Sequence, residues 1–215
     1  MLLTRTTPLA DCKRKTDGMT LFMVDLDPAH VTIRPIPKMG RHAVSSCEVW
    51  YDNLPVHESE RIGEEGQGFK YLLDSLNAER ILVAWQAIQL GRRALERATA
   101  YAKERHIFGR AIGQNQGIQF PLADSYAKLE AAEILTMKAA WQYDKGLPCG
   151  DLANIAKYLG TEAAFEAADR AMQTHGGYGY AREYHVERYF RETRLWKIAP
   201  ISQNLVLSYV AEKVL

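Results

Sequence analysis

Glu79 is the residue whose type and neighbours in the sequence most directly suggest chemistry. On a helix of about 3.6 residues per turn, the residues that share its face are Leu72, Leu76, Leu82 and Val83. Aliphatic neighbours remove water from a carboxylate and disfavour its charged form. Glu79 is therefore a candidate proton acceptor near neutral pH. The alternative is a glutamate at the edge of an apolar stripe, which reaches solvent or pairs with an arginine.

A second candidate is the basic and aromatic segment 105–110, with the sequence Arg-His-Ile-Phe-Gly-Arg, just beyond a predicted long helix. A guanidinium fork fits phosphate oxygens, so this segment could clamp an anion. Its cations would also offset the negative C-terminal dipole of the preceding helix, and this capping role is the alternative.

A third candidate is the glycine-rich segment 173–180, Gln-Thr-His-Gly-Gly-Tyr-Gly-Tyr. Glycines let the backbone approach a flat or phosphate-bearing ligand closely, although glycine also simply ends helices. His175 is expected to form a hydrogen bond within a loop rather than to bind a metal, because no second ligand lies at metal-ligand spacing. The amides of Gln114, Asn115 and Gln116 are expected to cap or cover the start of a helix.

The composition is that of a globular protein, with 215 residues, 47% hydrophobic and 25% charged. A formal net charge of +1 provides no general attraction to nucleic acid or to an anionic membrane, so neither is an expected partner. The three cysteines are far apart and are expected to be free thiols in a reducing compartment. No apolar run is long enough to cross a bilayer, and the N-terminus lacks a targeting pattern, so a cytoplasmic location is expected.

Short β-like runs precede residue 63. Asp17-Gly18 and Asp27-Pro28 predict turns, and strands are expected over residues 21–26, 31–36 and 47–51. Three or four strands cannot close a barrel, so this part is expected to be a piece of an antiparallel sheet rather than a complete β domain.

Long helical patterns follow the glycine-rich hinge at residues 62–68. Helices are predicted over residues 69–104, 119–143 and 151–174, followed by a short amphipathic turn at 186–191 and a last helix with Pro200 in its first turn. Long helices joined by short loops favour an antiparallel bundle. The expected fold class is α+β, mostly α, with a C-terminal antiparallel helical bundle (63–215) preceded by an incomplete antiparallel β-sheet domain (1–62).

Four segments in this order resemble the acyl-CoA dehydrogenase family. They are Gly63-Glu64-Glu65-Gly66-Gln67-Gly68-Phe69, Glu104-Arg105-His106-Ile107-Phe108-Gly109, Gln114-Asn115-Gln116-Gly117-Ile118-Gln119-Phe120 and His175-Gly176-Gly177-Tyr178-Gly179-Tyr180, the last followed by Tyr184, Val186, Glu187, Arg188 and Arg191. The resemblance covers essentially the whole chain. Family members have an N-terminal helical domain, a middle β domain and a C-terminal helical bundle. The chain resembles only the second half of the β domain and the bundle, so it is expected to be a fragment or a gene product that begins late.

The resemblance implies FAD and an acyl-CoA substrate. A carboxylate of the family removes the α proton while a hydride leaves the β carbon for the flavin. In some members this carboxylate lies in a Tyr-Glu-Gly-Thr motif, which here is Ala199-Pro200-Ile201-Ser202 and has proline at the glutamate position. The alternative position of the carboxylate matches Glu79, which makes Glu79 the expected catalytic base. The family also uses a backbone N–H at that motif to bind the thioester carbonyl. Proline has none, so either a neighbouring amide such as that of Ile201 replaces it or the alignment is displaced by a residue.

The same resemblance assigns binding residues. Asn77 and Arg80 match positions near the acyl-CoA. The positions that match flavin contacts, several of them across a dimer interface, are Arg105, Ile107, Phe108, Gln116, Gln173, Gly176, Gly177, Ser202 and Asn204. A homodimer or homotetramer, an electron-accepting flavoprotein partner and a role in fatty acid metabolism are also implied.

Two alternatives stay open at this point. One is a non-catalytic truncated fragment that oligomerises without holding flavin. The other is a related flavin oxidase or monooxygenase of the same superfamily.

Overall fold

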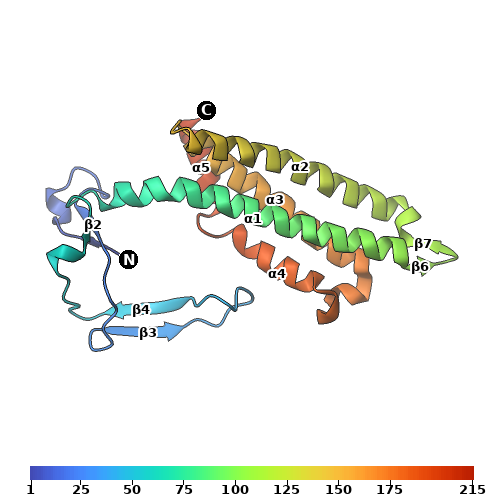
Figure 1. The fold of residues 1–215 in the computed structure, drawn as a ribbon, viewed down its shortest axis with the longest axis horizontal. Coiled ribbons are helices and arrows are strands. Elements are labelled where there is room, and N and C mark those ends of the chain that lie inside the picture. Colours follow the sequence, from blue (N-terminus) through green and yellow to red (C-terminus); the bar gives the residue numbers. More distant parts are fainter. The chain divides into compact units, whose positions relative to one another are not determined.

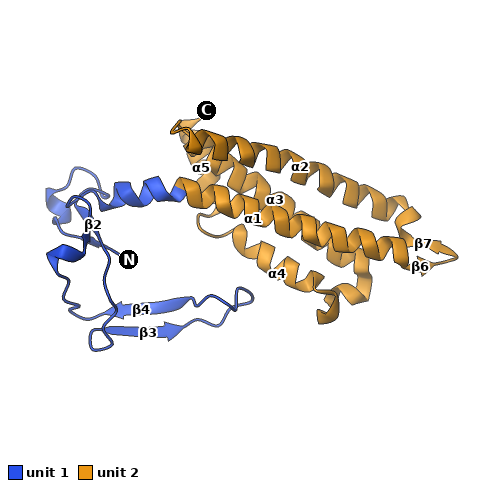
Figure 2. Cartoon of the chain, viewed as in Figure 1, with its two compact units in different colours: residues 1–76 blue, residues 77–215 orange.

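The computed structural model describes residues 1–215, which form two compact units, Met1–Leu76 and Asn77–Leu215 (Figure 2). The longest helix, α1 (Gly68–Glu104), contributes residues 68–76 to the first unit and 77–104 to the second. Helices dominate and every paired strand is antiparallel, which confirms the expected fold class. No helix is long and apolar enough to cross a membrane.

The first unit holds two small antiparallel sheets. The strands are β1 (Leu2–Arg5), β2 (Met19–Phe22) and β5 (Arg61–Ile62), in the order β1-β2-β5, and a separate hairpin of β3 (Val31–Pro35) and β4 (Cys47–Tyr51). The prediction for 47–51 is confirmed and that for 31–36 ends one residue early. The strand expected over 21–26 begins and ends earlier, as β2 at residues 19–22, because the buried side chains end at Phe22 and Met23 is exposed. Strands β1 and β5 were not predicted.

Two glycines fix how this unit turns and packs. Gly18, at the predicted turn before β2, has a φ of +68°, which glycine adopts without strain. A Cβ on Gly68 would lie 2.6 Å from the backbone nitrogen of Leu21, so only glycine lets α1 begin against β2.

The second unit is a bundle in which residues 77–104 of α1 run beside α2 and α3, with α4 beside α3 (Figure 1). The helices other than α1 are α2 (Gln116–Asp144), α3 (Gly150–His175), α4 (Val186–Trp196) and α5 (Gln203–Lys213). The three long helices were predicted to within a few residues at each end. Gly176 ends α3 with a φ of +59°, as expected for a glycine cap.

Two predictions about the C-terminal segment are wrong. The turn expected at 186–191 is a helix of 11 residues, α4. Helix α5 does not contain Pro200 but begins after Ser202, whose hydroxyl accepts a hydrogen bond from the Leu205 amide at 3.3 Å. A serine N-cap satisfies one of the free amides at a helix start, and this defines where α5 begins. Pro200 lies in the connection from α4, after a cis peptide bond.

Small side chains form the centre of the bundle. The largest buried cluster combines four helices through Val83, Ala87, Ile88, Leu95, Leu129, Ala132, Ala163, Ala164, Ala167 and Trp196. A Cβ on Gly91 of α1 would lie 2.8 Å from the Cα of Ala164 on α3. The axes of α1 and α3 are therefore close enough at this point to require glycine.

The basic segment after α1 forms a tight hairpin that was predicted only as a turn. Strands β6 (His106–Ile107) and β7 (Arg110–Ala111) pair across Phe108 and Gly109, whose φ angles are +53° and +81°. Positive φ at both central positions is the type I′ geometry that suits the twist of a two-residue hairpin.

We expect Gly91→Ala to lower the free energy of unfolding by about 1–3 kcal/mol, because the added methyl group must displace the backbone of α3. The matched control is Gly117→Ala near the start of α2, where a Cβ meets nothing within 4 Å. That variant should be neutral or stabilised by up to about 1 kcal/mol, because alanine favours the helix over glycine. Chemical denaturation measures both. Equal effects of the two substitutions would contradict the close approach of α1 and α3.

Candidate functional site

One cavity of the second unit lies where the end of α1 meets the end of α3. Its volume is 580 Å³, within the range of about 300–1,000 Å³ that is common for small-molecule sites. It is lined by Tyr101, Arg105, Ile107, Ile112, Gln173, Thr174, His175, Gly176, Gly177, Tyr178 and Ala181. The lining therefore combines aromatic rings, a cation and exposed glycine backbone.

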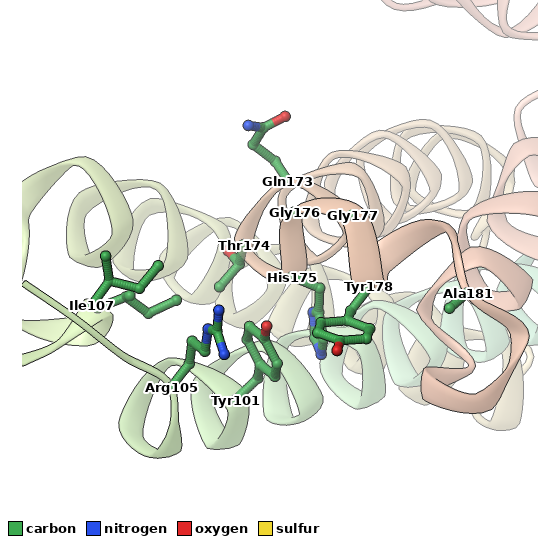
Figure 3. A pocket seen from close by; sticks show the side chains of 11 residues that line it. Tyr101, Arg105, Ile107, Gln173, Thr174, His175, Gly176, Gly177, Tyr178 and Ala181 are labelled. Atoms are coloured by element: carbon green, nitrogen blue, oxygen red, sulfur yellow. The ribbon is translucent and has the colours of Figure 1, made fainter.

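Stacked rings form one wall of this cavity (Figure 3). Tyr101 and His175 stack with centroids 4.4 Å apart and planes 23° apart, and the ring of Tyr184 meets both edge-on. Tyr178 lies against Tyr184 at 5.1 Å. Figure 3 shows Tyr101, Arg105, His175 and Tyr178 gathered together, whereas the side chain of Gln173 points away from them.

His175 is buried, and its Nδ1 lies 2.8 Å from the carbonyl oxygen of Ala171, so it belongs to the end of α3 rather than to a loop as expected. Burial lowers its pKa from the usual value of 6.5, the Ala171 carbonyl opposes that shift, and the nearby charge of Arg97 adds to it. The imidazole is therefore neutral at pH 7, with a proton on Nδ1 available to the carbonyl.

Arg105 supplies the cation of the cavity. Its side chain is exposed and has no ion-pair or hydrogen-bond partner within the chain. A Cβ at Gly176 or Gly177 would meet nothing within 4 Å, so the backbone there is open to a ligand. A free guanidinium beside glycine backbone that a ligand can approach closely suits an anionic group such as a phosphate.

The cavity brings together five of the nine positions expected to contact flavin, namely Arg105, Ile107, Gln173, Gly176 and Gly177. The other four do not line it. Phe108 projects fully into solvent at the hairpin tip, and Gln116 is exposed in the first turn of α2. Ser202 and Asn204 lie at the start of α5, where Ser202 caps the helix.

Tyr101 was not predicted as a cavity residue, and Thr174 and Tyr178 were named only as part of the glycine-rich segment. A signal was present for Tyr101, because it precedes Arg105 by one helical turn and must share its face of α1. Thr174 and Tyr178 become neighbours of α1 only through the packing of α3, which no local pattern contains.

Glu79 is exposed, so the expectation that this chain buries it among aliphatic side chains is wrong. Val83, one turn further along α1, is buried, but Leu82 is 62% exposed. Glu79 therefore stands at the edge of the buried face. Burial lowers the pKa of the neighbouring Arg80, and the charges of Tyr209 and Glu79 oppose that shift.

The two residues expected near acyl-CoA are hydrogen-bonded to each other. The Arg80 guanidinium donates to the side-chain oxygen of Asn77 at 3.0 Å, and its Nε is buried without a partner. Tyr209 of α5 lies close by and donates to Asp151 at 2.7 Å, which raises the pKa of the phenol. This polar cluster lies at the opposite end of residues 77–104 of α1 from Arg105.

The second unit is thus a bundle of long helices whose cavity combines a cation, aromatic rings and exposed glycine backbone. A family model described as "Acyl-CoA dehydrogenase, C-terminal domain" matches residues 66–215. The chain therefore belongs to the acyl-CoA dehydrogenase family.

Similar proteins support this assignment. An acyl-CoA dehydrogenase of Bacillus subtilis is 40% identical over 84% of the chain and 48% of its own length, and a 3-(aryl)acrylate reductase of Clostridium sporogenes is 35% identical over 95% and 55%. The structure of butyryl-CoA dehydrogenase from Megasphaera elsdenii matches with a TM-score of 0.91 and 32% identity, over 99% of the chain and 55% of that structure. The chain thus spans about half the length of the proteins it matches.

The buried imidazole predicts a dependence of stability on acid. Below its usual pKa of 6.5 an unfolded histidine binds a proton that native His175 does not, so stability is complete above pH 6.5 and is lost as pH falls towards the native pKa. We expect the thermal midpoint of the chain to rise between pH 5 and pH 7, and to rise less in His175→Phe. His42→Phe, at an exposed histidine, is the control and should keep the full rise. Identical pH profiles for the chain and His175→Phe would contradict the prediction.

Proposed function

We propose that the chain serves FAD-dependent α,β-dehydrogenation of an acyl-CoA thioester. The observation that carries this proposal is the cavity at the ends of α1 and α3, which joins an unpaired guanidinium, open glycine backbone and aromatic rings. The residues present fit a dinucleotide, because the Arg105 guanidinium suits phosphate oxygens and the glycine backbone at 176–177 lets such a ligand approach closely. When bound, FAD supplies the acceptor for the hydride that leaves the β carbon.

The remaining flavin contacts would come from outside this cavity. Free amides at the start of α5, beside Ser202 and Asn204, suit phosphate or polar groups of the cofactor. Phe108, at the hairpin tip, and Gln116, at the start of α2, are exposed and suit a flavin held by a second copy of the chain. A homodimer or homotetramer is therefore part of the proposal. Exposed apolar side chains along α2, among them Ile134, Met137 and Trp141, support self-association.

Glu79 is proposed as the base that takes the α proton onto a carboxylate oxygen. An exposed carboxylate beside exposed Leu82 is accessible to a substrate, and a bound acyl chain would displace water from it. The electron pair left on the α carbon spreads to the thioester oxygen as an enolate. Arg80, held by Asn77, places a positive charge next to Glu79 and favours that anionic product.

The reduced cofactor must then be reoxidised, for which an electron-accepting flavoprotein is the proposed partner. A related oxidase would instead use oxygen directly. Rapid reaction of the acyl-CoA-reduced chain with oxygen would favour the oxidase, and slow reaction would favour the dehydrogenase.

A second candidate function is reduction of an α,β-unsaturated acyl group, favoured by the similarity to a 3-(aryl)acrylate reductase. The same residues serve both directions, since protonated Glu79 would return its proton to the α carbon. Mixing the chain carrying reduced flavin with a cinnamoyl thioester measures the reductase half-reaction. Mixing the chain carrying oxidised flavin with a saturated acyl-CoA measures the dehydrogenase half-reaction, and the two rates show which direction is faster.

We expect Glu79→Gln to retain bound flavin and to lower the rate of flavin bleaching by acyl-CoA by at least about 10²-fold, because a neutral amide cannot accept the α proton. The measurement is anaerobic absorbance of the purified chain near the visible flavin maximum. Glu96→Gln, at another exposed glutamate of α1, is the matched control and should bleach at the original rate. Unchanged bleaching in Glu79→Gln would remove this residue from the chemistry.

We expect Arg105→Gln to weaken flavin binding by about 10- to 100-fold, because a hydrogen bond to a charged group contributes about 1.5–3 kcal/mol. Lys103→Gln, which removes a cation from the same turn but does not line the cavity, should change the affinity by less than about threefold. Fluorescence titration of apoprotein with FAD measures both. A colourless purified chain that takes up no added FAD would favour the non-catalytic alternative.

A further inference from the structure

Lys157 on α3 is a completely buried lysine, the largest of the side chains with almost no exposure. Lysine is rarely buried without a partner, because removing an ammonium group from water is costly. Its Nζ donates a hydrogen bond of 2.5 Å to the carbonyl oxygen of Ile201, 44 residues away in the connection between α4 and α5. The structure therefore uses a buried charge to hold one backbone carbonyl.

The charges around Lys157 do not neutralise it. Burial, together with repulsion from Arg80 on α1, lowers its pKa from 10.5 to about 8, although Glu162 on α3 opposes the shift. Glu162 is itself engaged by Lys197 at the end of α4, at 2.9 Å, and by the side chain of Gln203 on α5. The strongest direct partner of the ammonium is therefore the Ile201 carbonyl.

This hydrogen bond orients the peptide group between Ile201 and Ser202. The peptide is trans, since the only cis bond of the chain precedes Pro200. In a planar trans peptide the C=O and N–H point in opposite directions. Because the carbonyl points at a buried ammonium, the Ser202 N–H points away from it, and it has no acceptor within the chain.

We propose that Lys157 is a positioning residue that directs the Ser202 N–H outward as the donor for the carbonyl oxygen of a bound thioester. The inference rests on the proposed function and deepens it. Proline at position 200 has no N–H, and the amides of Ile198 and Ala199 donate to the Leu195 carbonyl. The donors left in this connection are the amides of Ile201 and Ser202, and Lys157 orients the peptide of the second. Lys157 holds the carbonyl of that peptide from the core side, whereas the two contacts through Glu162 engage only the side chains of Lys197 and Gln203.

The first test needs no flavin. In ¹⁵N-labelled chain, the Ser202 amide resonance should titrate with a midpoint near pH 8 as Lys157 loses its proton. Lys157→Met should abolish that titration, whereas Lys197→Met, which also loses a lysine contact of the connection, should keep it. A Ser202 resonance that does not titrate in the unsubstituted chain, or that titrates alike in Lys157→Met, overturns the proposal. The first of these results decides the matter even if Lys157→Met fails to fold.

The second test adds butyryl-CoA to the same samples. Hydrogen bonding to the thioester should move the Ser202 proton resonance downfield by several tenths of a ppm in the unsubstituted chain and in Lys197→Met, and by much less in Lys157→Met. An equal shift in Lys157→Met, or no shift in the unsubstituted chain at saturating butyryl-CoA, overturns the proposal. Failure of the proposed function is a separate result, namely a chain that shifts its Ser202 resonance but shows no flavin bleaching.

Discussion

The close packing of α1 against α3 is the constraint on which both ends of the site depend. Gly91 faces Ala164, and Gly160 faces Ile88, with Cβ-equivalent distances of 2.8 Å and 3.2 Å that leave no room for larger side chains. Interiors this dense transmit small changes in volume, so the separation of the two helices is closely defined. At one end this packing places Tyr101 against His175, and at the other it places Arg80 near Lys157. The cavity and the polar cluster are therefore consequences of the same helix pair.

The exposure of Glu79 shows how far helical periodicity can be used. The three long helices and their caps were predictable because their apolar spacing and their terminal glycines are local features. Which side of α1 is buried was not predictable in the same way, because its sequence carries two apolar sides. Ala84, Ala87 and Ile88 pack in the bundle, whereas Leu82 and Trp85 are exposed. Alanines produce a weaker hydrophobic signal than leucines, yet they are the residues that permit close packing.

The candidate site was predictable in part for a related reason. Arg105, Gly176 and Gly177 are in short segments whose residue types already suggest anion or cofactor binding, and the structure brings them to one cavity. Tyr101 is marked only by its spacing from Arg105 and Thr174 only by its place in the glycine-rich segment, and the two become neighbours only through tertiary packing. Lys157 carried a signal that was not used, because Asn154, Lys157 and Thr161 follow the spacing of the buried alanines of α3. A lysine on a face predicted to be buried means either that the face has been assigned wrongly or that the lysine has a specific hydrogen-bond acceptor.

The burial of Lys157 is best explained by what its replacement would leave behind. An apolar side chain of similar volume would remove the cost of a desolvated ammonium, and such replacements of buried charges are often neutral or stabilising. It would also leave the Ile201 carbonyl buried without a donor and the connection to α5 free to rotate its peptide groups. The cost of the desolvated ammonium and the cost of an unpaired carbonyl thus oppose each other, so stability alone does not explain a lysine at this position. A requirement for one defined orientation of the Ile201–Ser202 peptide gives a direct reason, because the Lys157 ammonium is the donor that holds that carbonyl from α3.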